Sequence, residues 1–304
     1  METGRESVRA RAFAKINLGL DVLGTRADGY HLLRTGMQSI SLADELLLTR
    51  TEEAGIMLCC DELSLPTDGR NLAVRAAEAV FRHCGLSGGV RIELKKQIPA
   101  EAGLGGGSAD AAAVLRGMRA LFALQLGDEA LRELALQLGA DVPFCVSGGT
   151  MLAEGIGEVL SPLSPMPPCH LVVVKPPCGS STKAVYAALS LKALRPWEQL
   201  DPRLLENALR GQNVTLLGAS LQNALEKPAT ELQPVLLDYR QFFAESGAAG
   251  ATMSGSGSAF FAVFPEAERD KAKQCIATGK KQFPAAAFFL CRPVSAEEVS
   301  ASTL

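Results

Sequence analysis

The feature that most constrains this chain is a cluster of glycines placed directly before a run of alanines. Residues 99–115 read PAEAGLGGGSADAAAVL, and four of the five residues from Gly103 to Gly107 are glycine. Each glycine costs roughly 0.5–1 kcal/mol of chain entropy relative to alanine. The compensating gain is the close approach of backbone N–H groups to an anion at a helix N-terminus. The segment predicts a phosphate-binding loop that leads into a helix, with Ser108 and Asp110 as candidate N-cap residues.

Clustered glycines also occur in Walker A loops, in dinucleotide-binding folds and in flexible linkers. A Walker A loop requires a lysine directly after its last glycine, and Ser108 stands there instead. A dinucleotide-binding fingerprint requires a buried strand immediately before the glycines, whereas RIEL at 91–94 is amphipathic and ends about eight residues earlier. A flexible linker accounts for one or two glycines better than for four followed by a helix start. The dinucleotide fold and the linker stay open as alternatives, and the phosphate loop is favoured.

Length and composition bound the class of protein. The chain has 304 residues, which predicts one or two domains, and its net charge of −3 indicates neither a nucleic-acid nor a membrane surface. The first 15 residues are charged and contain no apolar core of a signal peptide. Eight cysteines occur without a Cys-x-x-Cys pair, and there are only three histidines, which argues against a zinc site. We therefore expect reduced thiols in a cytoplasm and no metal site built from side chains.

Hydrophobic periodicity predicts a two-domain α+β protein. The proline-rich segment 161–168 marks the expected boundary, so that the domains cover 1–163 and 164–304. In the first domain we expect strands at 8–24, 44–53, 55–60 and 89–97, and helices at 71–85, 108–124 and 127–140. In the second we expect strands at 169–176 and 285–294, and a glycine turn running into a strand at 251–264. We also expect helices at 181–190, 232–248 and 268–282, and a loop entering a helix at 195–205.

Four segments resemble the GHMP kinases, and they occur in the family's order. They are AKINLGLDVLGTRADGYHLL at 14–33, the glycine segment, LGADVPFCVSGGTMLAEGIGE at 138–158 and GAAGATMSGSGSAFFAVF at 247–264. The resemblance implies a ribosomal-protein-S5-like N-terminal domain and a ferredoxin-like C-terminal domain, with the active site between them. It implies a bacterial enzyme that transfers the γ-phosphate of ATP, with Mg²⁺, to an alcohol. The ADGYH pattern points to a branch whose small-molecule substrate is a cytidyl-diphosphate sugar alcohol, used in isoprenoid precursor synthesis.

The resemblance assigns chemistry to two residues. Asp141, taken alone, is typical of a helix cap or turn, and Lys15 of a lysine at the surface of a strand. In the family, the matching aspartate accepts the proton of the substrate hydroxyl, and the matching lysine lies beside it. A cation there keeps the carboxylate ionised and opposes the charge on the transferred phosphoryl group.

Four residues are expected to bind the substrate. Asn17 leaves the same face of its strand as Lys15, two residues away, and can bond the polyol. Tyr30 and His31 follow a D-G turn, and Tyr186 falls in a predicted helix. Without the resemblance, His31 and Tyr186 are equally well accounted for as ordinary packing residues. The resemblance implies that Tyr30 and Tyr186 stack on the cytosine and that His31 bonds its polar edge.

ATP is expected to bind at the glycine loop. The cofactor-binding residues are Asn71, Pro99, Ala100, Glu101, Ala102, Gly103, Leu104, Gly105, Gly106, Gly107, Ser108 and Ala109. Asn71 contacts the adenine by resemblance alone, since its position before a predicted helix equally suits an N-cap. The chain departs from the family at Ala109, where a second serine is common, and at Ala224, where aspartate is common. Magnesium is implied by the nucleotide and not by a cluster of side chains.

Three alternatives compete with this assignment. Another GHMP kinase, such as a homoserine kinase, would have no reason to carry the DGYH sequence. A non-catalytic nucleotide-binding relative would have no reason to keep both Lys15 and Asp141. A dinucleotide-dependent oxidoreductase would bind NADH instead of ATP. The sequence leaves the oligomeric state open.

Overall fold

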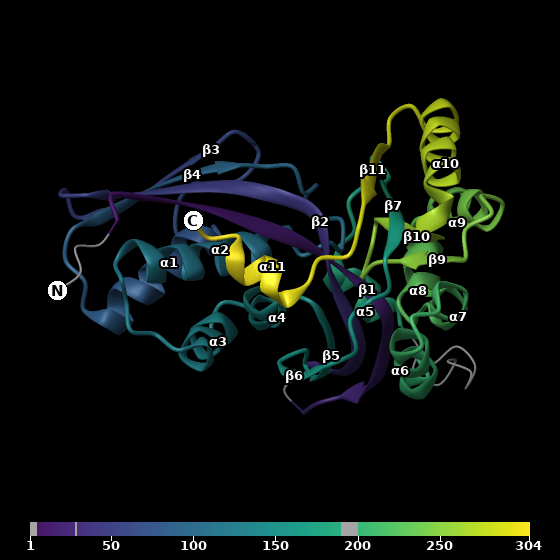
Figure 1. Cartoon of the computed structure of the whole chain (residues 1–304), viewed down its shortest axis with the longest axis horizontal. Helices are drawn as coiled ribbons and strands as arrows, with labels where there is room; N and C mark the ends of the chain where they lie inside the picture. Colours follow the sequence, from purple (N-terminus) through teal and green to yellow (C-terminus); the bar gives the residue numbers. More distant parts are fainter. Residues whose placement is uncertain (1–4, 28, 190–199) are drawn as a thin grey trace.

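Two β-sheets organise the chain, one in each half. The computed structural model describes residues 5–27, 29–189 and 200–304 (Figure 1). In these ranges, a seven-stranded sheet carries the N-terminal half and a four-stranded antiparallel sheet carries the C-terminal half. Asp28 of the predicted D-G turn, and residues 195–199 of the predicted loop, lie outside the described residues. None of the helices in those ranges combines the length and apolar character needed to cross a bilayer.

The N-terminal sheet is built on two long strands. Its strands are β1 (Ser7–Thr25), β2 (His31–Thr51), β3 (Gly55–Cys60), β4 (Gly89–Lys95), β5 (Thr150–Gly155), β6 (Val159–Pro162) and β8 (Gln222–Asn223). The order is β3-β4-β2-β1-β8, and β5 pairs with both β2 and β6. The pairs β3–β4 and β1–β8 are parallel, and the others are antiparallel.

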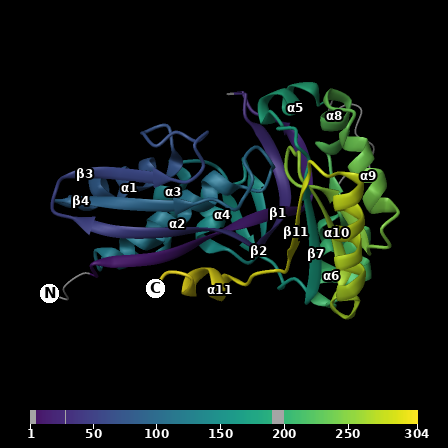
Figure 2. The ribbon, with the colours of Figure 1, turned by 90° about the horizontal axis from the view of Figure 1, so that it is seen from above.

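The burial pattern of β1 shows that the strand has one face in water at its start and is covered on both faces further along. Ser7, Arg9 and Arg11 are exposed and alternate with buried residues, as expected for a strand with one face in water. The whole of 12–22 is buried, because this part of the strand is covered on both sides. Figure 2 shows the same strand passing from the N-terminal sheet towards the C-terminal one.

Four helices cover one face of the N-terminal sheet (Figure 1). They are α1 (Leu72–Cys84), α2 (Gly106–Leu121), α3 (Asp128–Leu136) and α4 (Val142–Ser147). The predicted N-caps Ser108 and Asp110 are wrong, since α2 begins two residues earlier, at Gly106, with Gly105 as its N-cap. Gly105 takes a left-handed conformation, which starts the helix without a side-chain cap. Ser108 and Asp110 therefore lie inside the first turns of α2.

The C-terminal sheet has the strand order of a ferredoxin-like domain. Its strands are β7 (Cys169–Lys175), β9 (Gly250–Met253), β10 (Phe260–Pro265) and β11 (Ala287–Cys291), in the order β11-β7-β10-β9. Its helices are α5 (Thr182–Ala188), α6 (Pro202–Arg210), α7 (Val214–Ser220), α8 (Glu226–Leu232), α9 (Leu236–Ala244), the short η3 (Glu266–Glu268) and α10 (Arg269–Gln282). The last helix, α11 (Ala296–Ala301), returns to the N-terminal half, where Val299 packs with Phe13 of β1 (Figure 1). The predicted fold class is confirmed.

Some elements differ from the predicted ones. The helix predicted at 232–248 is shorter in the structure, where it corresponds to α9 and begins at Leu236, two residues after Pro234. In place of the predicted glycine turn running into one strand, the segment 251–264 forms the antiparallel β9–β10 hairpin, with the turn between its two strands. The structure adds α4, α7, α8, β5, β6, β8 and α11, which periodicity did not predict because each is short.

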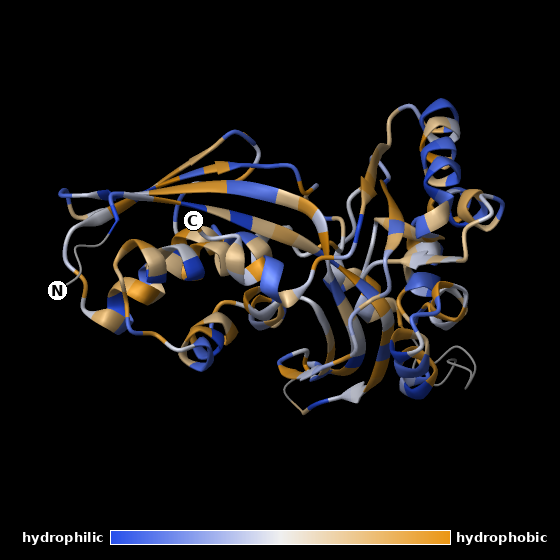
Figure 3. Cartoon of the chain, viewed as in Figure 1, coloured by the Kyte–Doolittle hydropathy of each residue, from blue (hydrophilic) through white to orange (hydrophobic). Residues whose placement is uncertain are grey.

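Each half of the chain contributes a segment that packs against the other half. The C-terminal residue Leu304 forms a pair of backbone hydrogen bonds with Arg9 of β1, at 2.9 and 3.0 Å. Leu20 and Val22 of β1 belong to the core under the C-terminal sheet, together with Phe260. Figure 3 shows apolar residues along the strands where the two sheets approach. The boundary at residue 163 stays a prediction.

Candidate active site

A cavity of about 740 Å³ opens between the N-terminal sheet, the start of α2 and the start of α5. Half of the predicted site residues line it. They are Lys15, Asn17, Tyr30, His31, Gly103, Gly105, Ser108, Asp141 and Tyr186. The other predicted residues do not line this cavity: Asn71, Pro99, Ala100, Glu101, Ala102, Leu104, Gly106, Gly107 and Ala109.

Lys15 and Asp141 form an ion pair inside this cavity. The distance from Lys15 Nζ to Asp141 Oδ2 is 3.5 Å, and the two side chains are 6% and 35% exposed. Asp141 occupies the N-cap position of α4, yet its side chain makes no capping hydrogen bond. The carboxylate is therefore available to the cavity, with a buried ammonium group on one side and open space on the other.

A buried arginine secures the helix that follows Asp141. The Arg116 guanidinium donates hydrogen bonds to the carbonyl oxygens of Cys145 in α4, at 2.8 Å, and of Arg11 in β1, at 3.1 Å. Its burial lowers the pKa of Arg116 to about 10, which leaves it charged at neutral pH. A cation at the carboxyl end of a helix is stabilising, so Arg116 ties α4 to α2 and β1.

A chain of polar contacts orients Lys15 and Asn17. Lys15 Nζ donates to Asn17 Oδ1 at 2.7 Å, and Asn17 Nδ2 donates to Thr35 Oγ1 at 2.8 Å. Thr35 in turn donates to the carbonyl oxygen of Gly19 at 2.7 Å. Because Asn17 is only 1% exposed, its amide is fixed by these partners. Lys15 and Asn17 therefore lie on the same face of β1, as predicted, and their side chains contact each other directly.

The glycine loop is held tightly by both halves of the chain. Gly103 has φ +73°, and a Cβ there would lie 2.0 Å from the carbonyl oxygen of Ser254. Gly105 has φ +70°, and a Cβ there would lie 2.9 Å from Lys15 Cγ. Only glycine tolerates both the dihedral angles and the close approach at these positions. The loop is therefore a constrained structure, which disfavours a flexible linker.

The start of α2 presents free backbone donors. The first N–H groups of a helix have no intrahelical acceptor, and no side chain caps this one. Ser108, in the same turn, lines the cavity. Backbone donors and the helix dipole together favour a phosphate at this position. Ala109 is 2% exposed and lies outside the cavity lining, so a hydroxyl there would not face the cavity.

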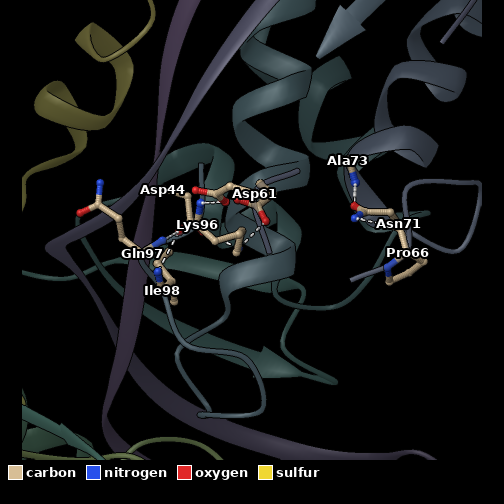
Figure 4. A network of polar contacts seen from close by, with 9 residues as sticks. Asp44, Asp61, Pro66, Asn71, Ala73, Lys96, Gln97 and Ile98 are labelled. Carbon is tan, nitrogen blue, oxygen red and sulfur yellow. Dashed lines mark hydrogen bonds and ion pairs between the residues drawn. The ribbon is translucent and has the colours of Figure 1, made fainter. Parts of the chain in front are cut away.

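Asn71 caps α1, a role that its position before a predicted helix already suggested. Its side chain accepts a hydrogen bond from the Ala73 N–H at 2.9 Å and donates to the Pro66 carbonyl oxygen at 2.8 Å (Figure 4). The neighbouring Leu72 lies beside the glycine loop, since a Cβ on Gly107 would be 3.7 Å from Leu72 Cδ1. The cap is a finding, and contact with adenine stays a prediction.

Two buried carboxylates share one lysine behind the glycine loop. Lys96 Nζ lies 2.5 Å from Asp44 Oδ2 and 2.6 Å from Asp110 Oδ2. Figure 4 shows Asp44 also accepting the N–H groups of Gln97 and Ile98, at 2.5 and 2.8 Å. Burial raises the pKa of Asp110, although Lys96 opposes this. The cluster fixes the chain where it enters the glycine loop.

An aromatic pair lies at the substrate side of the cavity. The rings of His31 and Tyr186 stack with centroids 4.7 Å apart and an interplanar angle of 14°. His31 Nδ1 lies 3.1 Å from Thr25 Oγ1. Burial, followed by the charge of Asp141, raises the pKa of Tyr186. Tyr30 lines the same cavity and is 62% exposed.

Several cavity residues were missed by the sequence analysis. Thr35, Thr182, Lys183, Gly255 and Ser256 all line the cavity. Gly255 and Ser256 belong to the segment 247–264, whose resemblance to the family is the signal that could have identified them. Thr35 and Lys183 carried no signal, since neither belongs to a distinctive motif.

The contacts of the third motif explain its sequence. Ser254 Oγ donates to the Gly103 carbonyl oxygen at 2.9 Å, and Ser256 Oγ lies 2.8 Å from Thr182 Oγ1. The loop thus joins the glycine loop to the start of α5.

In the described ranges, no group of three His, Cys, Asp or Glu side chains is arranged to hold a metal ion.

Known sequences and structures match this arrangement. The GHMP kinases N terminal domain matches residues 71–149, and the GHMP kinases C terminal domain matches residues 203–281. A solved homoserine kinase from Cytophaga hutchinsonii superposes with a TM-score of 0.78 at 21% identity, over 97% of this chain and 98% of that one, which shows a shared fold.

Proteins with a higher sequence identity to this chain than the homoserine kinase are named as one kind of kinase. A 4-diphosphocytidyl-2-C-methyl-D-erythritol kinase from Acetivibrio thermocellus is 43% identical over 261 residues, which cover 85% of this chain and 90% of the relative. The corresponding Clostridium perfringens protein is 40% identical over 259 residues, covering 85% and 89%. A crystal structure of 4-(cytidine 5'-diphospho)-2C-methyl-D-erythritol kinase covers 93% of this chain and 99% of its own, with 39% identity and a TM-score of 0.77. The chain is therefore a kinase that belongs to the GHMP kinases and, within them, to the 4-diphosphocytidyl-2-C-methyl-D-erythritol kinase family.

Proposed function

We propose that this kinase transfers the γ-phosphate of ATP to the 2-hydroxyl of 4-diphosphocytidyl-2-C-methyl-D-erythritol, in the synthesis of isoprenoid precursors. The observation that carries the proposal is the Lys15–Asp141 ion pair, 3.5 Å apart, in a cavity that the start of α2 also lines. A hydroxyl beside Asp141 and a phosphate at α2 would face each other across this cavity. The names of the relatives supply the substrate.

The residues divide the reaction between them. Asp141 accepts the proton of the hydroxyl as its oxygen forms a bond to the γ-phosphorus. The bond from that phosphorus to the β–γ bridging oxygen breaks, and ADP leaves. Lys15 opposes the negative charge of the transferred group, and Asn17 holds the Lys15 ammonium in place at 2.7 Å.

ATP fits the glycine loop by its chemistry. The first turn of α2 offers backbone N–H groups to the phosphates, and Ser108 adds a hydroxyl in the same turn. The triphosphate of ATP would bring Mg²⁺ with it, and Ser108 is the side chain we expect nearest to the ion. Bound Mg²⁺ would neutralise phosphate charge, which is its usual contribution to phosphoryl transfer.

Substrate recognition is proposed to involve the aromatic pair. Stacking of a base on an aromatic ring contributes about 1–3 kcal/mol. His31 and Tyr186 stack on each other at 4.7 Å, so a base can stack on the outer face of this pair but cannot enter between the rings. Tyr30, exposed at the same cavity, remains the proposed second ring. The cytoplasmic location stays a prediction, and the oligomeric state stays open.

A substrate panel tests the proposal. ADP release would be measured with the cytidyl substrate, homoserine and mevalonate in parallel. The proposal requires the cytidyl compound to have the highest kcat/KM. A higher value with homoserine or mevalonate would replace it with another GHMP kinase activity, and no ADP release with any of them would support a non-catalytic relative.

A further inference from the structure

Among the described residues, the charges that line the cavity leave one cation without a partner. Three lining residues carry a formal charge, Lys15, Asp141 and Lys183. Lys15 and Asp141 compensate each other in their ion pair. Lys183 is exposed, and within the described ranges it forms neither an ion pair nor a side-chain hydrogen bond. In this part of the chain the cavity therefore has one uncompensated positive charge, which sits on α5.

The fold determines where this charge lies. Lys183 precedes Tyr186 by three residues, and side chains with this spacing lie on the same face of a helix. Both line the cavity, while Val185 on the opposite side is 2% exposed and anchors α5 in the core. Ser181 caps α5 by accepting the Ala184 N–H at 3.3 Å. The orientation of Lys183 towards the cavity follows from these contacts.

Contacts also link Lys183 to the Lys15 end of the cavity. A Cβ on Gly255 would lie 3.3 Å from Lys15 Nζ. The next residue, Ser256, contacts Thr182, the neighbour of Lys183, at 2.8 Å between the hydroxyl oxygens. Lys183 thus lies on the wall that runs from Lys15 to Tyr186.

We propose that Lys183 is the diphosphate-binding residue for the alcohol substrate. The inference rests on the proposed function, in which the cytosine stacks near Tyr186 and the reacting hydroxyl lies beside Asp141. In such a substrate the diphosphate is the link between these two ends. It carries negative charge, and Lys183 supplies a compensating ammonium group along the same wall. A nucleoside diphosphate contacts Lys183 through its phosphates, whereas a nucleoside has no phosphate and cannot make this contact.

Ligand binding tests this directly. Isothermal titration with CDP and with cytidine would compare the wild type, Lys183→Ala, Lys183→Arg and, as a matched control, Lys281→Ala on the exposed surface of α10. We expect Lys183→Ala to weaken CDP roughly 10- to 100-fold and to leave cytidine unchanged, since a charge-assisted hydrogen bond is lost. Lys183→Arg retains most of the CDP affinity, and Lys281→Ala behaves as the wild type.

Steady-state kinetics tests the role of Lys183 separately from the proposed kinase function. In Lys183→Ala, KM for the cytidyl substrate rises by a similar factor, while kcat and KM for ATP stay close to wild type. Unchanged CDP affinity in Lys183→Ala, or a rise confined to KM for ATP, would overturn the diphosphate assignment. If the wild type fails to phosphorylate the cytidyl substrate, the proposed function falls, while loss of CDP affinity in Lys183→Ala still supports the diphosphate site.

Discussion

Lys15 Nζ lies 3.5 Å from Asp141 Oδ2, which joins the middle of the first strand to the start of α4. The lysine is nearly buried, and Asn17 and the backbone of the glycine loop hold it. Its backbone N–H donates to the Leu104 carbonyl oxygen at 3.0 Å, and its Nζ donates to Asn17. The same residue therefore positions the carboxylate that we propose as base and the loop that we propose binds phosphate.

Replacing the proposed base should stop chemistry without unfolding the protein. In Asp141→Asn we expect kcat to fall by roughly 10²- to 10⁴-fold, the usual range for the loss of a general base. KM for ATP should change little, because the α2 N-terminus is untouched. Asp238→Asn, on the exposed side of α9, serves as the control. A kcat for Asp141→Asn within a few-fold of wild type would remove Asp141 from the mechanism.

Two nearby glycines provide a matched test of the loop. A Cβ at Gly105 would press on Lys15 Cγ at 2.9 Å and requires φ +70°, whereas a Cβ at Gly107 meets only Leu72, at an ordinary 3.7 Å. We expect Gly105→Ala to raise KM for ATP and lower kcat by about tenfold or more, with a stability loss of about 1–2 kcal/mol from the left-handed backbone. Gly107→Ala should be close to wild type in thermal melting and kinetics. Equal effects of the two substitutions would show that the loop geometry is not what matters.

The sequence predicted those parts of the fold that depend on neighbouring residues. The strand predicted at 8–24 and the helical spacing after Asn71 both appear in the structure, although exposed and buried residues alternate only at the start of β1. The start of α2 did not follow from residue preferences. Ser108 is the better cap by type, but Gly103 packs against the Ser254 carbonyl oxygen, and this contact from the other half of the chain sets the path of the loop.

The candidate site was predictable as a set of residues but not as an arrangement. Periodicity could not bring Lys15 and Asp141 together, and only the resemblance paired them. Lys183 could not be recognised from the sequence, because several distant segments form the cavity that it lines. Only the structure shows that, among the described residues, Lys183 is the charged lining residue without a partner. Such features depend on tertiary contacts, which a single sequence does not reveal.

The pair of carboxylates around Lys96 should make stability depend on pH. Burial raises the pKa of Asp110 above its ordinary value of 3.8. The folded state therefore binds this proton more tightly than the unfolded state does. The resulting stabilisation is complete below about pH 4 and is lost as the pH rises through the raised pKa.

Asp110→Asn removes this titration and keeps an oxygen that can accept from Lys96. We expect the free energy of unfolding, measured by urea titration from pH 5 to 9, to fall less steeply with pH in the variant than in wild type. Asp238→Asn should keep the wild-type slope. Parallel profiles for wild type and Asp110→Asn would mean that Asp110 is ionised throughout this range.

The aromatic pair gives the sharpest test of substrate recognition. Tyr186 already stacks on His31 at 4.7 Å, so Tyr186→Ala removes a ring that would support the base and also frees His31. We expect KM for the cytidyl substrate to rise roughly 5- to 100-fold, corresponding to about 1–3 kcal/mol of stacking, while KM for ATP stays constant. Tyr186→Phe keeps the ring and should be mild. Tyr30→Ala should have a comparable effect if its exposed ring closes on the base, and Tyr239→Phe, in the C-terminal core, is the control for a tyrosine outside the cavity. The assignment fails if both alanine variants keep the wild-type KM for the cytidyl substrate, because neither ring would then touch the base.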